Sequence, residues 1–221
     1  MKQKDEKNNF KAGIVGYGDL GKQIVRFLVQ SGTFEEDDFI FFDDHAYERK
    51  DKNSYAFSAY KAADFKLLPL YVGLGYKHLP FRLQIINELI ARGQKASGFI
   101  HSTSFINETA TIGPGAIIYP MCNIDQNVYV ETGCILNNSV VVSHDSLIGA
   151  GSFLAPGVIL SGNVKTGQNC FLGSGTVVSN GVTLGNRVIA AVGSVITRDY
   201  GDDVFLAGAP AKPLRRAFKL K

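Results

Sequence analysis

The sequence predicts a small parallel α/β unit followed by a column of short stacked strands. Residues 100–200 keep an apolar period of six residues without an insertion, while residues 11–93 alternate apolar strands with amphipathic helices. A six-residue period drifts off the 3.6-residue face of any helix, so the second part is a repeat of strands and corners. Alternation of strands with helices favours a parallel sheet in the first part.

The α/β unit is predicted from three apolar runs and two helical patterns. The expected elements are, in order, a strand at 11–18, a helix to residue 30, a strand at 39–42, a polar connection to residue 66, a strand at 67–74, and a helix from Pro80 to near Gly93. This arrangement is a small, Rossmann-like βαβαβ unit.

The repeat has two restricted positions in every six-residue unit, or hexad. The first position is nearly always Ile, Leu or Val and is expected to fill the interior: Ile100, Ile106, Ile112, Ile118, Ile124, Val130, Leu136, Val142, Ile148, Leu154, Leu160, Thr166, Leu172, Val178, Leu184, Ala190 and Ile196. The fifth position is small, and it includes all three cysteines, which we expect to be packed as small hydrophobic residues rather than to act as thiols.

Glycines gather at the second and fourth hexad positions. Examples are Gly113, Gly115, Gly149, Gly151, Gly173 and Gly175. Glycine adopts positive φ without a steric penalty, so both positions are predicted to be tight corners with positive φ.

Bulk composition excludes several classes of protein. Lys and Arg total 23 against 20 for Asp and Glu, a net charge of +3 that is too weak to indicate nucleic-acid binding. The charged N-terminal segment MKQKDEKNNF lacks an apolar core, and no apolar run is long enough to span a bilayer. We therefore expect a cytoplasmic protein without a signal peptide or membrane contact.

A glycine-rich turn follows the first predicted strand. Gly16, Gly18 and Gly21 match the G-x-G-x-x-G pattern, and Asp43 ends the next strand. This pattern is typical of dinucleotide binding. Two alternatives remain: a purely structural tight turn, or a different nucleotide with its phosphates at the helix N-terminus.

His144 is the histidine that lies well inside the repeat. It occupies the third position of its hexad, which is a corner, and Asp145 follows it directly. Imidazole titrates near neutral pH, so His144 is a candidate general base, and Asp145 is a candidate to orient its ring. The alternatives are a plain surface histidine and a solvated turn carboxylate.

These features together resemble the hexapeptide-repeat N-acetyltransferases that modify 4-amino nucleotide sugars, of the bacillosamine and perosamine type. The similarity covers residues 11–215 and is carried by the glycine turn with Asp43 and Asp44, GFIHSTS at 98–104, His144 with Asp145, APGVILSGNV at 155–164, and AGAPAK at 207–212. The resemblance implies a left-handed parallel β-helix with three hexads per coil.

The resemblance also implies domains and partners. It predicts a nucleotide-sugar-binding domain at 1–97 and a β-helix acyltransferase domain at 98–221. It further implies a homotrimer with active sites between subunits, acetyl-CoA as co-substrate, no metal, and a place in bacterial surface glycan (O-antigen) biosynthesis. The predicted reaction is acetyl transfer to the 4-amino group of a nucleotide-linked sugar, without a covalent acyl-enzyme.

The resemblance assigns roles to residues of this sequence. The catalytic candidates are His144 as base, Asp145 and Asn137. The candidates for binding the nucleotide sugar are Gly16, Gly18, Asp19, Lys22, Asp43, Asp44 and Gly73. The candidates for binding acetyl-CoA are Phe153, Gly162, Gly173, Ser174 and Ala191.

Two residues depart from the pattern of the family. Many relatives carry a histidine in the glycine turn where Asp19 stands, and the acid after the base is often Glu rather than Asp145. The rival functions are an O-acetyltransferase, a non-catalytic β-helix scaffold, a nicotinamide oxidoreductase, and a metal hydratase, which needs three histidine ligands that the repeat does not supply.

Overall fold

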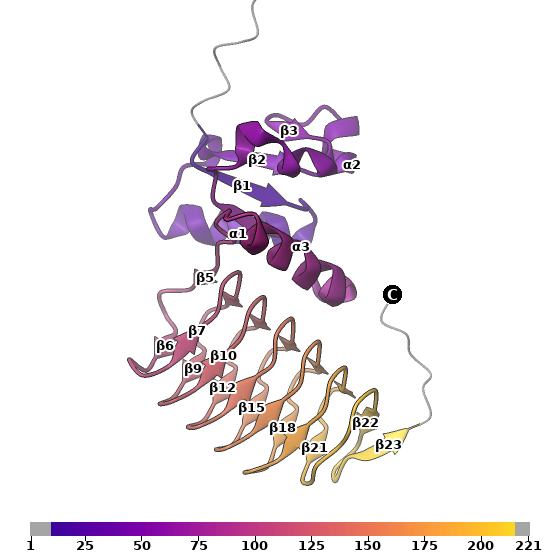
Figure 1. Ribbon diagram of the computed structural model, residues 1–221. Coiled ribbons are helices and arrows are strands. Elements are labelled where there is room, and N and C mark those ends of the chain that lie inside the picture. Colours follow the sequence, from indigo (N-terminus) through magenta and orange to yellow (C-terminus); the bar gives the residue numbers. More distant parts are fainter. Residues whose placement is uncertain (1–9, 215–221) are drawn as a thin grey trace, which may run out of the picture. The chain divides into compact units, whose positions relative to one another are not determined.

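The computed structural model describes residues 10–214, which form two compact units. The α/β unit contains the chain up to Gly75 together with Gln84–Ser97, and the β-helix unit contains Tyr76–Leu83 together with the chain from Gly98 onward. Figure 1 shows the elements of both units. Residues 1–9, which carry most of the charged segment MKQKDEKNNF, and residues 215–221 lie outside the described residues. The functional division into 1–97 and 98–221 stays a prediction.

The α/β unit is built on a parallel four-stranded sheet with the strand order β3-β2-β1-β4. The strands are β1 (Ala12–Val15), β2 (Phe39–Phe42), β3 (Ser54–Tyr55) and β4 (Leu70–Val72). Three expectations need correction. The strand expected at 11–18 is limited to Ala12–Val15. The connection before residue 66 contains the two-residue strand β3, which is too short to show a pattern. The strand expected at 67–74 is shorter, and Leu67 is 96% exposed.

The two predicted helices are present with nearly the expected bounds, as α1 (Asp19–Gln30) and α3 (Leu79–Ala91). The polar connection also contains a short helix that was not predicted, α2 (Asp44–Glu48). The short 3₁₀ turns are Glu36–Asp38, Phe57–Lys61, Ala63–Phe65 and Tyr76–His78. On one side of the sheet, Ile40 and Phe42 of β2 pack in a core with Ile86 and Leu89 from the part of α3 that belongs to this unit.

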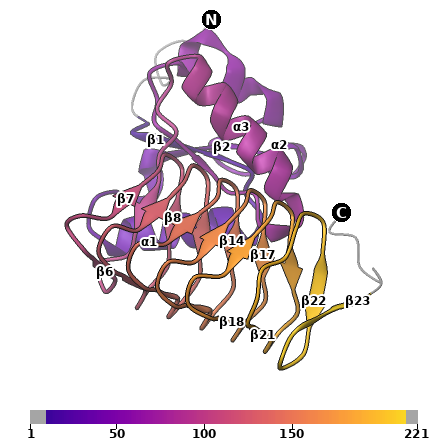
Figure 2. The ribbon, with the colours of Figure 1, turned by 60° about the horizontal axis from the view of Figure 1, so that its bottom comes forward.

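The β-helix unit consists of three parallel sheets, and each coil of the chain contributes one strand to each sheet (Figure 2). Strands pair with strands 18 residues further on, as Ile117 does with Ile135 and Ile135 with Phe153. Three hexads therefore close one coil. Together with the α/β unit, this arrangement confirms the predicted fold class, a small parallel α/β unit followed by a left-handed parallel β-helix.

We number the three faces of the β-helix in chain order. Face 1 holds β5 (Phe99–Ile100), β8 (Ile117–Ile118), β11 (Ile135–Leu136), β14 (Phe153–Leu154), β17 (Phe171–Leu172), β20 (Ile189–Ala190), β22 (Phe205–Ala207) and the antiparallel β23 (Lys212–Leu214). Face 2 holds β6 (Phe105–Ile106), β9 (Asn123–Ile124), β12 (Val141–Val142), β15 (Ile159–Leu160), β18 (Val177–Val178) and β21 (Val195–Ile196). Face 3 holds β7 (Thr111–Ile112), β10 (Tyr129–Val130), β13 (Leu147–Ile148), β16 (Lys165–Thr166) and β19 (Thr183–Leu184).

The corners between the faces follow one backbone rule. The fourth position of every hexad from Gly115 to Gly193 has positive φ. The non-glycine residues at this position are Met121, Asn127, Ser139, Asp145, Asn163, Asn169 and Arg187. The prediction for the second position was wrong, because Gly113, Gly149 and Gly173 do not have positive φ. These glycines are needed for space instead: a Cβ on Gly113 would lie 2.7 Å from the backbone of the next coil.

The interior is filled as the repeat predicts. First-position residues from Ile118 onward are fully buried, and all three cysteines are buried and free. The first coil is an exception, because Ile100 is 43% exposed at the open end of the column. Burial raises the pKa of Cys134 to about 12 and that of Cys170 to about 11, which agrees with a packing role.

The segment Tyr76–Leu83 covers part of face 1. The Tyr76 ring lies 5.6 Å from Phe153 and 5.7 Å from Phe171. Arg82 is buried and donates hydrogen bonds to the carbonyl oxygen of Gly133 and, at 2.7 Å, to that of Gly115. Burial lowers the pKa of its guanidinium to about 10, so it stays charged at neutral pH and fastens this segment to the corners between faces 3 and 1.

Arg82→Met is expected to lower the free energy of unfolding by about 2–3 kcal/mol, because two buried carbonyl groups lose a charged donor while the aliphatic stem is kept. The midpoint of chemical denaturation measures this change. Lys165→Met, which removes an exposed cation from face 3, should leave the midpoint unchanged. Equal midpoints for both variants would contradict the anchoring role of Arg82.

Candidate functional site

His144 lies at the corner between faces 2 and 3, which we call edge 2–3. Its side chain is 44% exposed, and its Nδ1 atom lies 2.8 Å from Oδ2 of Asp145. Asp145 adopts φ 58°, a conformation that Asp and Asn tolerate better than most residues. The corner therefore turns the carboxylate of Asp145 back toward the imidazole that precedes it.

The pair leaves one ring nitrogen available. When Nδ1 donates to the Asp145 carboxylate, the neutral ring presents Nε2 as an acceptor. The hydrogen bond from His144, together with a second one from Asn127, holds the pKa of Asp145 below its usual range. The carboxylate is thus ionised at neutral pH, as required of a group that orients a base and stabilises its protonated form.

Gly162 lies one coil beyond His144 on the same edge. A Cβ on Gly162 would lie 2.6 Å from both Cε1 and Nε2 of His144 and 2.9 Å from Oδ1 of Asn180. The imidazole and the Asn180 amide therefore flank a position that only glycine can occupy. The missing side chain leaves room for the imidazole itself, whose Cε1 and Nε2 atoms pack against Gly162.

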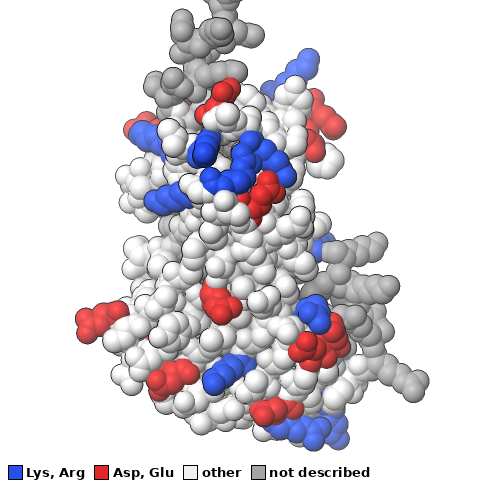
Figure 3. All heavy atoms as spheres, viewed as in Figure 1, with Lys and Arg blue, Asp and Glu red and all other residues white. Residues whose placement is uncertain are grey.

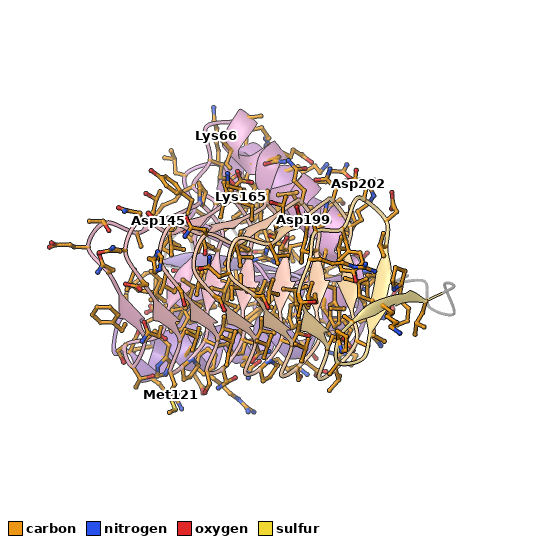
Figure 4. All side chains as sticks on the ribbon, turned by 90° about the horizontal axis from the view of Figure 1, so that it is seen from below. Lys66, Met121, Asp145, Lys165, Asp199 and Asp202 are labelled. Carbon is orange, nitrogen blue, oxygen red and sulfur yellow. The ribbon has the colours of Figure 1, made fainter. Side chains whose placement is uncertain are left out.

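The other predicted residues of the reaction lie on a different edge. Asn137, Gly173, Ser174 and Ala191 follow strands of face 1 and occupy the corner between faces 1 and 2, edge 1–2. Met121 of edge 1–2 and Asp145 of edge 2–3 lie on opposite sides of the coils (Figure 4). The structure thus brings His144, Asp145 and Gly162 together, but it does not bring Asn137 to His144 within one chain.

Phe153 has a different environment from the other predicted acetyl-CoA ligands. Its ring stacks on Phe171 at 5.4 Å with an interplanar angle of 5°, and it lies beneath Tyr76 on face 1. Only 8% of Phe153 is exposed. This position favours a packing role in attaching the segment Tyr76–Leu83.

The predicted nucleotide turn is formed by close backbone packing in the α/β unit. Gly16 has φ 87°, and a Cβ on either Gly21 or Gly73 would collide with its carbonyl oxygen. These three glycines thus let the ends of β1 and β4 approach the start of α1. Gly18, at the N-cap of α1, has no atom within 4 Å of its missing Cβ and is open on that side.

Asp43 has a structural role in this turn. One carboxylate oxygen accepts from the Tyr17 backbone N–H at 2.9 Å, and the other accepts from the Ala46 N–H at 2.9 Å, which caps α2. Asp44 accepts from the Phe57 N–H at 2.8 Å. Asp43 therefore joins the glycine turn to the end of β2, a role that the dinucleotide fingerprint does not predict.

Asp19 and Lys22 are exposed at the start of α1. The Lys22 ammonium lies 5.8 Å from the Tyr17 ring centroid, and Tyr17 stacks on Phe41 at 3.9 Å. A groove of about 540 Å³ opens beside them. It is lined by Tyr17, Lys22, Val25, Arg26, Glu36, Asp37, Phe41, Asp51, Lys52 and Asn53. Its lining is of mixed charge, as is the surface of this unit in Figure 3.

Among residues 10–214, no group of three His, Cys, Asp or Glu side chains has a geometry suited to a metal ion. No helix in the same range has the length and apolar character to cross a membrane.

Sequence reasoning missed two residues of the site, Asn127 and Asn180. Asn127 precedes Asp145 by 18 residues, and Asn180 follows Gly162 by the same interval, so each lies one coil away from a residue of the predicted site. The coil length implied by the resemblance could have found both, because residues one coil apart stack on one edge.

Comparisons with known proteins agree with this architecture. Residues 97–198 match the family model described as the GMPPB C-terminal domain. A search of curated protein sequences gave no significant match.

Two solved proteins resemble the chain over nearly its whole length. The acetyltransferase domain of PglB from Neisseria gonorrhoeae FA1090 is 28% identical, with 93% of this chain and 100% of that chain covered and a TM-score of 0.82. The same domain in complex with acetyl coenzyme A is 27% identical, with 94% and 100% covered and a TM-score of 0.79. PerB from Caulobacter crescentus, in complex with CoA and GDP-perosamine, is 25% identical, with 92% and 97% covered and a TM-score of 0.82.

Gly162→Ala is expected to displace the imidazole of His144, because the added methyl group would lie 2.6 Å from Nε2. Nitrogen NMR of the His144 ring should show loss of the Nδ1–Asp145 hydrogen bond while the melting temperature changes little. Gly201→Ala is the matched control, since no atom lies within 4 Å of the added Cβ. An unchanged His144 signal in Gly162→Ala would contradict the described packing.

Proposed function

From the confirmed resemblance to the hexapeptide-repeat sugar acetyltransferases, we propose that this chain transfers an acetyl group from acetyl-CoA to the 4-amino group of a nucleotide-linked amino sugar. The observation that carries the proposal is the His144–Asp145 pair on edge 2–3, in which Nδ1 of a partly exposed imidazole lies 2.8 Å from the Asp145 carboxylate. The complexes of the similar proteins with acetyl coenzyme A, and with CoA and GDP-perosamine, support the substrate classes.

In the proposed reaction, His144 acts as a general base. The neutral amine attacks the thioester carbonyl carbon while Nε2 takes a proton from the nitrogen that forms the new C–N bond. The C–S bond then breaks, and the imidazolium returns the proton to the departing CoA sulfur. Base catalysis of this kind contributes roughly 10²–10⁴-fold, and Asp145 stabilises the transient imidazolium. Backbone N–H groups at a corner of the β-helix would stabilise the oxyanion.

The cysteines support direct transfer rather than a covalent acyl-enzyme. Cys122, Cys134 and Cys170 are all buried inside the coils, and burial raises the pKa of each thiol. A buried thiol with a raised pKa is a poor nucleophile because little thiolate is present.

The α/β unit is proposed to bind the nucleotide of the acceptor. Its open Gly18 at the N-terminus of α1 and the nearby Lys22 suit a phosphate. Asp19, which is exposed at the same helix start, limits how closely a pyrophosphate can approach. Both oxygens of Asp43 accept backbone hydrogen bonds within the α/β unit. Asp43 therefore stabilises the fold of this turn in addition to its proposed role in binding the nucleotide sugar.

A homotrimer is part of the proposal, because face 2 carries partly exposed apolar side chains between the two edges that hold the predicted residues. Its outward side chains are Phe105, Asn123, Val141, Ile159, Val177 and Val195, of which Phe105 is 58% and Ile159 40% exposed. If three copies pack face 2 around a common axis, edge 2–3 of one copy meets edge 1–2 of its neighbour. Asn137, Gly173, Ser174 and Ala191 would then face His144 across the seam.

The cellular role follows from the proposed substrates. Nucleotide-linked amino sugars and acetyl-CoA are activated, charged metabolites, so we place the reaction in the cytoplasm and among the steps that prepare sugars for bacterial surface glycans, such as O-antigen.

The reaction itself is tested by release of free CoA thiol from acetyl-CoA with 4-amino sugars linked to UDP, dTDP or GDP. At least one of these acceptors should react, and the matching 4-hydroxy sugar should not. Transfer to the hydroxyl acceptor instead would identify an O-acetyltransferase, and the absence of both transfer and CoA binding would favour a scaffold.

His144→Ala is expected to lower kcat at least a hundredfold with little change in nucleotide-sugar affinity, because a positioned base supplies roughly 10²–10⁴-fold. Steady-state kinetics and calorimetry measure the two quantities. His78→Ala, at a histidine of the 3₁₀ turn Tyr76–His78, is the control and should keep the parent kcat. Near-normal turnover by His144→Ala would remove His144 from the mechanism.

Ile159→Asp is expected to dissociate the trimer, because it places a charge at the centre of the apolar face 2. Sedimentation or light scattering reports the mass. Tyr129→Asp, on face 3 with 54% exposure, should remain trimeric. A trimer that survives Ile159→Asp but is lost in Tyr129→Asp would assign the interface to face 3.

A further inference from the structure

Asn127 contacts the proposed base pair from the preceding coil. Its Nδ2 atom donates a hydrogen bond to Oδ1 of Asp145 at 3.0 Å, and the other oxygen of Asp145 lies 2.8 Å from Nδ1 of His144. Asn127 and Asp145 both occupy the fourth hexad position, with φ 55° and 58°. The three side chains therefore form a chain of hydrogen bonds that runs across two stacked coils.

The carboxylate of Asp145 needs this second partner. His144 and Asp145 are adjacent in sequence, and both side chains are 44% exposed. An exposed ion pair between two mobile side chains contributes little by itself. A hydrogen bond from the neighbouring coil fixes the rotation of the carboxylate and leaves one oxygen directed at the imidazole.

We propose that Asn127 is a positioning residue for the reaction, which holds Asp145 so that His144 keeps its proton on Nδ1 and presents Nε2 to the substrate amine. The inference rests on the proposed function and extends it. It also explains how an Asp, which is one methylene shorter than Glu, can serve beside the base.

The electrostatic environment agrees with this role. The pKa of Asp145 is lowered by hydrogen bonds, from His144 first and from Asn127 second. The Asn127 backbone is held separately, because its N–H donates to Oγ1 of Thr109 at 2.9 Å. Changes to the amide therefore leave the corner supported.

Two substitutions separate positioning from local structure. Asn127→Gly removes the amide but accepts the positive φ, and Asn127→Asp also accepts it while placing an acceptor against the Asp145 carboxylate. If the residue only forms the corner, the Asp variant should resemble the parent. If it positions Asp145, kcat should fall in the order Asn, Gly, Asp, by roughly 10- to 100-fold, as for other groups that orient a histidine.

Asn163→Gly is the matched control for the backbone. Asn163 lies one coil beyond Asp145 on the same edge, has φ 58°, and has no side-chain hydrogen bond within the described part of the chain. Its kcat should stay within about threefold of the parent, since no hydrogen bond to Asp145 is lost.

The decisive measurement is the ratio of the two neutral tautomers of His144, read by nitrogen NMR without substrates. The parent should hold the Nδ1–H tautomer, and the Gly and Asp variants should shift toward a mixture, with KM for both substrates unchanged. A parent-like tautomer ratio and kcat in both variants would overturn the proposal. If neither the parent protein nor any variant transfers acetyl groups, the proposed function fails. The tautomer ratio would still test whether the Asn127–Asp145 hydrogen bond positions His144.

Discussion

Hydrogen bonds between strands 18 residues apart are the constraint on which this molecule depends. They fix the coil length, and they bring each residue of a strand next to its counterpart one coil away. The fourth position of each hexad must then turn with positive φ from Gly115 to Gly193. Asn, Asp and Gly fill most of these corners because they accept that conformation at the least cost.

This constraint places the polar residues of the proposed site at the edges of the β-helix. Side chains at the second, third and fourth positions project from the corners, so a polar residue there meets its counterparts in the adjacent coils. His144, Gly162 and Asn180 form one such column, and Asn127 with Asp145 forms another beside it. The interior is filled mainly by apolar side chains, and the three cysteines are buried among them.

Much of the architecture could be predicted, because a period of six and a strand–helix alternation are strong signals. The corner position of His144 and the burial of the first hexad position followed directly. The role of Arg82 was not predicted, because an arginine in an amphipathic helix usually lies on the solvent-exposed face. Here its guanidinium donates hydrogen bonds to two carbonyl groups of the β-helix. Sequence alone does not show that the oxygens of Asp43, a candidate for binding the nucleotide sugar, accept hydrogen bonds from Tyr17 and Ala46.

We propose that His144 of one copy acts with edge 1–2 of another. Mixed assemblies test it most directly: His144→Ala and Asn137→Ala subunits, inactive alone, are unfolded together and reassembled. The account predicts recovery of roughly a quarter of the parent activity, as expected for random assembly of two subunit types in a closed ring. Activity no greater than the sum of the separate variants would contradict a site shared between copies.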